Sequence, residues 1–526
     1  MQFLKFSTLI LASLAISLSE ICAEAGAARA PQAAAWAGFV EPDFPFFSSV
    51  LDARDLGAEW PGDNLTPRGL ILNLGNGCWA CFDTELLRMS AIWEGQGVTP
   101  AAMSQGSYLQ AGHKAPDGQE ALPRIAGIPW VANGIYPGWQ AGELPILADP
   151  REPGPDPREI GRGPLPERLG RFKAIRLTRD GVGLEYEIGK TAVREWVTVG
   201  MVNDSRRIVR HFALGAVDRR LWLMLGHKSS GVSQDVEINP SAYSVGGTIR
   251  KIEQPNGCIA IQIEPSHHAE EFSVVFGRSP AYELLGAPAF LSATNLAEHH
   301  AGRDAGAPSG VRWPQVVTTR ATLSQATNAY VLDNIPLPLE IPWKRNVRLA
   351  DIAFFRDGRA AAVTFDGDVW LLTGLGRNLG TVQWRRFASG LHEPLSLCIR
   401  DEQMFVFDRN GIWRLRDTNG DGEADVYVLF SNAFAQTAES REFANGMKLA
   451  PDSSFIIAKG GQQSSTLGKH NGSVLRVSPD GKTATVLGWG LRQPFVGVYF
   501  MIGLVIVSDQ QGYYVFATFL HIIRDR

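Results

Sequence analysis

Short apolar stretches that end in polar or glycine turns recur along the C-terminal part of the chain. They begin near residues 352, 397, 447 and 498, which is a spacing of 45 to 51 residues. Their apolar positions alternate with period two and are rich in Val, Ile, Phe and Trp, a pattern that favours β-strands over helices. Self-similarity at this period predicts the four-stranded blades of a β-propeller.

A second pattern recurs with the blades. Gly390-Leu391-His392-Glu393-Pro394 returns one hundred residues later as Gly490-Leu491-Arg492-Gln493-Pro494. The apolar stretch that follows, 495–507, is too short for a spanning helix, which needs about 20 apolar residues. It is therefore interpreted as a hairpin of a fourth blade. We expect a partial propeller of about four blades over 336–526, a shortened form of something longer.

Upstream of the propeller, short apolar runs bounded by Gly, Asn and Asp turns predict further strands. The first half of this region is interpreted as loop-heavy, and a proline-rich connector, Ile335 to Trp343, is taken as its end. Strands at such spacing suggest a β-sandwich. The predicted fold is all-β, with a sandwich-like domain over 61–335 followed by the propeller blades. The clearest strands are expected at 172–178, 182–188, 193–199, 208–214, 242–249, 258–263 and 272–275.

The N-terminus has the features of a signal peptide. Met1 to Lys5 is short and basic, 6–18 is apolar, and Ala23-Glu24-Ala25 offers small residues for cleavage. We assign 1–25 to this peptide and 26–60 to an Ala- and Pro-rich leader that includes an aromatic cluster. The protein is expected to be periplasmic or secreted, with no membrane span in the mature chain.

Composition narrows the function classes. The chain has 526 residues, 45% of them hydrophobic, and a formal net charge of -4. This balance predicts a globular protein without the broad basic surface that nucleic acid requires. The sequence contains none of the GxSxG, HExxH or Walker motifs, so hydrolase and nucleotide chemistry have no support.

The sharpest chemical motif is an acidic loop in the second blade. Oxygen-bearing side chains at positions one, three and five, with Gly at six, follow the start of a calcium loop. The twelfth position is Val428 instead of a bidentate Glu, which argues against an EF-hand. The sequence predicts a structural calcium turn between two strands, with a solvated turn as the alternative. The candidate ligands are Asp417, Asn419, Asp421, Glu423 and Asp425.

Two nearby cysteines have CxxC spacing. Covalent haem attachment requires His directly after the second Cys, and Phe82 stands there. We therefore expect no covalent haem in this chain. A local disulfide between Cys78 and Cys81 is the simplest interpretation for an exported protein.

The blade pattern, the acidic loop, the strand Asn471 to Gly481 and the Gly490 to Pro494 segment resemble the pyrroloquinoline-quinone (PQQ) glucose/sorbosone dehydrogenase propellers. They are most similar to exported bacterial proteins that join an N-terminal β domain to such a propeller and then to a c-type cytochrome domain. The resemblance covers 330–526 well. It implies PQQ as cofactor, a sugar or polyol substrate, and a c-type cytochrome as electron acceptor.

The resemblance also implies residue roles. In the family an Arg-Asn pair contacts the quinone; Arg492 matches the Arg and Gln493 replaces the Asn. A cation there stabilises charge as hydride arrives. The family's general-base His has no counterpart near Glu442, and we therefore consider Glu442 as a substitute base. Lys459 is considered as a further cofactor contact that reaches the propeller axis, with a surface lysine as the alternative.

Two hypotheses follow from these residues. The first is a quinoprotein-like dehydrogenase that passes electrons from a sugar or polyol to a cytochrome. The second is a non-catalytic, calcium-stabilised propeller that binds carbohydrate or a protein partner. Arg492 and the family resemblance favour the first, and the missing His favours the second.

Overall fold

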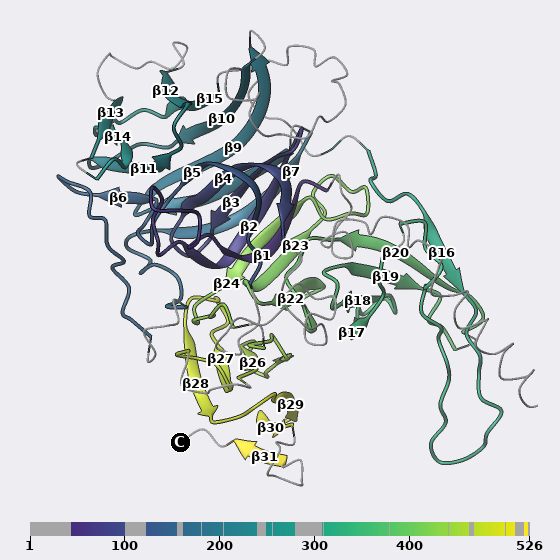
Figure 1. The fold of residues 1–526 in the computed structure, drawn as a ribbon. Coiled ribbons are helices and arrows are strands. Elements are labelled where there is room, and N and C mark those ends of the chain that lie inside the picture. The colour runs from purple at the N-terminus through teal and green to yellow at the C-terminus, as the bar shows by residue number, and fades with distance from the viewer. Residues whose placement is uncertain are drawn as a thin grey trace, which may run out of the picture. The chain divides into compact units, whose positions relative to one another are not determined.

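The computed structural model describes residues 44–99, 122–154, 161–179, 181–202, 205–238, 249–254, 256–278, 308, 310–343, 345–377, 379–439, 441–461, 468–499, 501–510 and 520–523. Every described element is a β-strand, which confirms the all-β prediction (Figure 1). The expected signal peptide and the strand expected at 242–249 lie outside the described residues, except for residue 249. No described segment forms a helix with the length and apolar character that a membrane crossing demands.

The N-terminal part is built on two large antiparallel sheets. The first runs in the order β1-β2-β3-β4-β5-β11-β14-β13, with β6 paired to β11. Its strands are β1 (Phe46–Asp52), β2 (Leu65–Gly75), β3 (Cys78–Asp83), β4 (Arg88–Val98), β5 (Ile125–Ala132), β6 (Trp139–Ala141), β11 (Leu221–Lys228), β13 (Ile249–Glu253) and β14 (Ile259–Ile263).

The second sheet has ten strands in the order β12-β15-β10-β9-β8-β7-β24-β23-β22-β21. Aromatic side chains of the two sheets meet in one core, where Phe82 of the first sheet contacts Phe172 and Tyr186 of the second. The sheets therefore form a sandwich-like pair. The N-terminal strands of this sheet are β7 (Arg171–Thr178), β8 (Gly181–Ile188), β9 (Thr191–Val202), β10 (Ser205–Leu214), β12 (Val232–Ile238) and β15 (Glu270–Arg278).

The prediction of a loop-heavy first half is wrong. The strands β2, β3 and β4 occupy that region and pair side by side. All six residues of β3 are buried, and so are the first eight of β2. A strand buried on both faces lacks the alternation of apolar and polar residues, so its local sequence does not resemble a half-exposed strand.

The C-terminal strands form four successive propeller-like sheets. Their first strands, β17, β21, β25 and β29, are neighbours in space, as expected at the hub of a propeller. Blade one is β17 (Leu349–Phe354), β18 (Ala360–Thr364), β19 (Val369–Thr373) and β20 (Val382–Ala388), extended by β16 (Val316–Thr319). Blade two is β21 (Ser396–Arg400), β22 (Gln403–Asp408), β23 (Gly411–Arg416) and β24 (Val426–Ser431). Blade three is β25 (Gly446–Leu449), β26 (Phe455–Lys459), β27 (Ser473–Val477) and β28 (Ala484–Trp489), and blade four is β29 (Phe495–Tyr499), β30 (Leu504–Ser508) and β31 (Leu520–Ile523).

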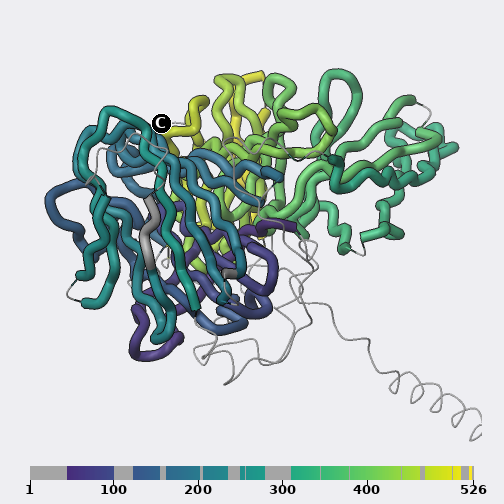
Figure 2. The backbone as a smooth tube through the Cα atoms, turned by 90° about the horizontal axis from the view of Figure 1, so that it is seen from above, coloured from purple at the N-terminus to yellow at the C-terminus, as the bar shows by residue number. Residues whose placement is uncertain are grey.

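Blade two is continuous with the sandwich. Its outer strand β24 pairs antiparallel with β7, with Val428 opposite Ala174 and Val426 opposite Arg176. The four strands of the blade thereby complete the ten-stranded sheet, and Figure 2 shows the green and blue segments running beside each other. The chain from Trp36 to Arg526 accordingly forms one compact unit.

The cysteine pair does not form the expected disulfide. Cys78 and Cys81 are both buried and free. They lie three residues apart on β3, so their side chains point to opposite faces of the sheet. The sequence of β3 does not show the alternation of a half-exposed strand. The disulfide prediction therefore rested on the CxxC spacing alone and was wrong.

We expect Trp413 to couple the blades to the sandwich. Its ring is fully buried and meets Phe172 of β7 edge-on, with ring centroids 6.4 Å apart. Trp413→Ala should lower the free energy of unfolding by about 3–5 kcal/mol in urea denaturation, because a large cavity opens. The loss of stability should appear as a shift of one unfolding transition that the sandwich and the blades share.

Trp489 provides the matched control, since 78% of its surface is exposed. Trp489→Ala should change the free energy of unfolding by less than about 0.5 kcal/mol. Two separate transitions, of which Trp413→Ala shifts only one, would show that the shared sheet does not couple the parts.

Candidate functional site

A repeated hydrogen-bond contact fixes the segments that precede the first strands of blades two and four. Before blade two, the backbone N–H of His392 donates to Asp408, the last residue of β22, at 2.9 Å. Before blade four, the N–H groups of Arg492 and Gln493 donate to Asp509, the residue directly after β30, at 2.9 and 2.8 Å. The recurring sequence motif is thus a structural repeat in which a carboxylate at the end of the second strand holds the preceding segment.

In blade three the carboxylate and its partner exchange places in this contact. Here the carboxylate, Glu442, lies in the preceding segment, and the turn supplies a cation, Lys459, at the end of β26. Lys459 Nζ lies 2.5 Å from Glu442 Oε1, and both side chains are fully buried. The sequence prediction singled out both residues, and the structure brings them into direct contact.

The second carboxylate oxygen of Glu442 is also occupied. It accepts hydrogen bonds from the N–H of Thr437 at 2.7 Å and from its hydroxyl at 2.5 Å. A general base must approach the proton that it removes and have a lone pair to receive it. Glu442 is fully buried with both oxygens engaged by the chain, so it does not approach a substrate proton in this arrangement and anchors Lys459.

Lys459 is held by three groups. Besides Glu442, its ammonium donates to the carbonyl oxygen of Ala435 and lies over the ring of Phe434, 5.4 Å from the centroid. Burial lowers the pKa of Lys459 to about 8, and the Coulombic attraction of Glu442 opposes this shift. The Lys459 ammonium is therefore engaged by groups of the chain itself.

Gln493 and Arg492 reach the same place from blade four. The Gln493 amide accepts from Asn445 Nδ2 and donates to the carbonyl of Arg441, both at 2.9 Å. Half-buried Arg492 accepts a hydrogen bond from the N–H of Gly461 through its carbonyl at 2.7 Å. All four predicted site residues thus gather at the end of β26.

The sandwich closes this region with a buried ionic network. Arg68 of β2 donates to Glu85 Oε1 at 3.0 Å and to the carbonyls of Asn432 and Arg409, both at 3.2 Å. Glu85 also pairs with Arg151 at 2.9 Å. Burial is the main influence on both groups, lowering the pKa of Arg68 and raising that of Glu85. Breaking such a network costs several kcal/mol.

Two titratable residues were missed from the sequence. His392 is buried and burial holds its pKa well below the usual value, so the imidazole is neutral. Glu439 is buried, with a pKa raised by desolvation to about 7, and its Oε2 has no hydrogen-bond partner among the described residues. The recurrence of the motif was a signal for His392, which occupies the position of Arg492. No local pattern marks Glu439.

These residues do not fit a bound PQQ as they are arranged. Lys459 is paired with Glu442, and the Gln493 amide is bonded at both ends within the fold. An added Cβ at Gly460 would lie 2.4 Å from Gln493 Oε1, so one side of the amide is in close contact with the chain's own backbone. We therefore derive no catalytic step through the quinone.

The first three candidate calcium ligands of the acidic loop lie in one tight turn, which hydrogen bonds of their side chains stabilise. Asp417 accepts hydrogen bonds from the N–H groups of Gly420 at 2.7 Å and Gly422 at 2.8 Å. Asn419 donates to Asp421 Oδ2 at 2.9 Å. Side chains at positions one, three and five of the predicted loop thus share one turn.

The other two candidate ligands are engaged elsewhere. Both oxygens of Glu423 accept backbone hydrogen bonds, from Arg312 at 2.9 Å and Trp313 at 2.6 Å. Asp425 accepts from the N–H of Thr418 at 2.7 Å. Within the described ranges no group of three or more His, Cys, Asp or Glu residues is arranged to hold a metal ion.

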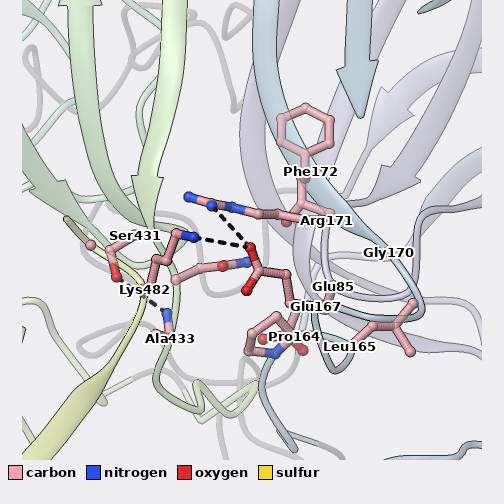
Figure 3. A pocket seen from close by; sticks show the side chains of 13 residues that line it. Glu85, Pro164, Leu165, Glu167, Gly170, Arg171, Phe172, Ser431, Ala433 and Lys482 are labelled. Atoms are coloured by element: carbon pink, nitrogen blue, oxygen red, sulfur yellow. Dashed lines mark hydrogen bonds and ion pairs between the residues drawn. The ribbon is translucent and has the colours of Figure 1, made fainter. Parts of the chain in front are cut away.

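A small cavity with polar and apolar walls lies at the junction of the sandwich with blades two and three (Figure 3). Its volume is about 100 Å³, room for several waters. Glu167 lies between two cations at its rim, 3.6 Å from Lys482 Nζ and 3.8 Å from Arg171 Nη1. Ser431 and Asn432 add polar groups to the wall.

Two family models match parts of the chain. A domain of unknown function, DUF6797, matches residues 80–195 in the sandwich, and another, DUF7133, matches residues 381–493 in the blades. The second match contains all four gathered site residues. No curated protein matches the chain.

Among solved structures, a Thermus thermophilus protein described as an oxidoreductase of the glucose dehydrogenase type is 16% identical, with a TM-score of 0.27. The match covers 34% of this chain and 62% of that protein, so the chain spans less than two thirds of its length. A Bacteroides thetaiotaomicron protein of unknown function is 10% identical, with a TM-score of 0.23, over 60% of this chain and 68% of its own.

Glu439 should make stability depend on pH. Its pKa rises from 4.5 to about 7 on folding, so the native state holds the proton more tightly than the unfolded state. Its stabilising contribution is therefore full below pH 4.5 and is lost as the pH rises through 7. Glu439→Gln should remove this decline, measured as the free energy of unfolding in urea between about pH 4.5 and 8. An unchanged pH slope in the variant would contradict the assignment.

Proposed function

We propose that the chain is an oxidoreductase-like β-propeller that binds a carbohydrate without oxidising it. The observation that carries the proposal is the burial and pairing of Glu442. This carboxylate stands where the family resemblance requires a base, yet Thr437 and Lys459 occupy both of its oxygens and its side chain is fully buried. Oxidation of a sugar hydroxyl needs an acceptor for the hydroxyl proton. The geometry thus supports binding better than turnover.

The carbohydrate class rests on the resemblance to glucose and sorbosone dehydrogenases. The cavity in Figure 3 supplies suitable chemistry, because charged groups form strong hydrogen bonds with hydroxyls. Lys482 and Glu167 are respectively 52% and 64% exposed at its rim, so a ligand can reach them from solvent. We assign the hydroxyl-bearing edge of one sugar to this cavity, in an exported protein of the periplasm or cell exterior.

Titration calorimetry with a panel of aldoses and polyols tests the proposal. The wild-type protein should bind at least one sugar, and Lys482→Ala should weaken that binding about tenfold, because a charge-assisted hydrogen bond is worth roughly 1.5–3 kcal/mol. Lys469→Ala, an exposed lysine outside the cavity, is the matched control and should bind as the wild type does. Dye reduction with added PQQ and calcium should stay flat.

A quinoprotein dehydrogenase that passes electrons to a c-type cytochrome is the second candidate. The observation in its favour is that Arg492, Gln493, Lys459 and Glu442 converge at the end of β26. Sugar-dependent dye reduction that requires PQQ and is abolished in Arg492→Ala would establish it and overturn the first proposal. Neither binding nor turnover across the panel would contradict both.

Calcium remains a proposal for the acidic loop. We propose that Asp417, Asn419 and Asp421 contribute side-chain oxygens and that the loop's backbone supplies others. A ligand at one hundred times its dissociation constant adds about 2.7 kcal/mol of stability. Calcium should therefore raise the melting temperature relative to EDTA in the wild type and in the control Asp480→Asn, but not in Asp417→Asn. Equal melting temperatures in calcium and EDTA would leave a turn held by hydrogen bonds alone.

A further inference from the structure

Two cations from distant parts of the chain meet at the rim of the cavity in Figure 3. Arg171 is the first residue of β7 in the sandwich, and Lys482 lies in the turn between β27 and β28 of blade three. Both side chains approach the carboxylate of Glu167 (Figure 3). The rim therefore collects positive charge from both parts of the chain around one carboxylate.

One carbonyl group of blade two sets the positions of both cations. The carbonyl oxygen of Phe430 on β24 accepts a hydrogen bond from Arg171 Nη2 at 3.4 Å. Gly481 packs against the same oxygen with a φ of 75°, and a Cβ at this position would collide with it. Only glycine combines this backbone conformation with so close an approach. The backbone that carries Lys482 is thus fixed beside Arg171.

The contacts of Glu167 with the two cations are loose. Its carboxylate lies 3.8 Å from Arg171 Nη1 and 3.6 Å from Lys482 Nζ, whereas charge-assisted hydrogen bonds span about 2.7–2.9 Å. Glu167 is also largely exposed, and exposed ion pairs add little to stability. In the same cavity, buried Glu85 holds Arg151 at 2.9 Å. Glu167 is therefore the carboxylate of this cavity that a ligand can displace.

We propose that the cavity selects sugars that carry an anionic group, a carboxylate or a sulfate ester, over neutral sugars. This preference rests on the proposed function, because it assigns a charge to the sugar that the cavity binds. The anionic group displaces Glu167 and lies between Arg171 and Lys482, whose guanidinium and ammonium groups donate charge-assisted hydrogen bonds to its oxygens. The sugar hydroxyls face the polar groups of the cavity wall. A neutral sugar leaves Glu167 in place and gains neither contact.

Titration calorimetry of the full chain with matched sugars tests the proposal. Glucose and galactose are each compared with the uronate and the 6-sulfate of the same sugar, which differ from the parent only at the sixth carbon. At least one acidic sugar should bind about tenfold more tightly than its neutral parent. Added salt should reduce this preference, because it screens exposed charges. The uronate and sulfate arms distinguish the two anionic groups.

Glu167→Gln tests the displacement itself. Removing the competing carboxylate should tighten binding of the acidic sugar about threefold and leave the affinity for the neutral parent unchanged. Lys482→Ala should weaken binding of the acidic sugar more than binding of its parent. Glu402→Gln is the matched control, because this carboxylate also forms an exposed ion pair, 3.6 Å from Arg356 Nε and outside the cavity. It should bind both sugars as the wild type does.

The outcomes separate this preference from carbohydrate binding itself. Equal affinity of the wild type for acidic and neutral sugars, or unchanged affinity of Glu167→Gln for the acidic sugar, would overturn the preference and leave carbohydrate binding intact. Inorganic sulfate that binds as tightly as a sugar 6-sulfate would also overturn it, because the sugar would then contribute nothing. Binding of none of these sugars would contradict the proposed function as well.

Discussion

The pairing of β24 with β7 is the constraint on which the structure depends. An outer propeller strand normally leaves a row of backbone N–H and C=O groups at a sheet edge, where another strand can bind. Here β7 binds that edge, with Tyr427 opposite Ile175, and joins blade two to the sandwich in one sheet. The pairing brings Arg68 of β2 against the carbonyls of Asn432 and Arg409, which lie in blade two and its connections.

Burial at this junction decides the chemistry of the gathered polar residues. Charged groups removed from water persist only when each finds a partner. Glu442 therefore holds Lys459, and Glu85 holds Arg68 and Arg151. A network paired in this way stabilises one relative position of the two parts, and it engages both oxygens of Glu442 within the chain. Glu442 and Lys459, two of the residues that suggest a dehydrogenase, are thus paired with each other.

The connector ahead of the blades completes the core of blade one. Trp370 and Trp384 are buried in one cluster with Ile341 and Val347, and Trp343 contacts Trp370 edge-on at 5.9 Å between ring centroids. Burying these large aromatic side chains stabilises the first blade against the residues that precede it.

The sequence by itself determined the strand content of the blades, their period and the strands from 171 to 214, because those strands alternate or end in Gly and Asp turns. The family resemblance, and not the repeated motif alone, singled out Glu442, Lys459, Arg492 and Gln493. Only the tertiary structure decided that β3 is buried on both faces, that Cys78 and Cys81 point apart, and that Lys459 neutralises Glu442. These outcomes depend on partners far away in the chain, as β7 and β24 show, and local patterning does not encode which distant edge a strand will meet.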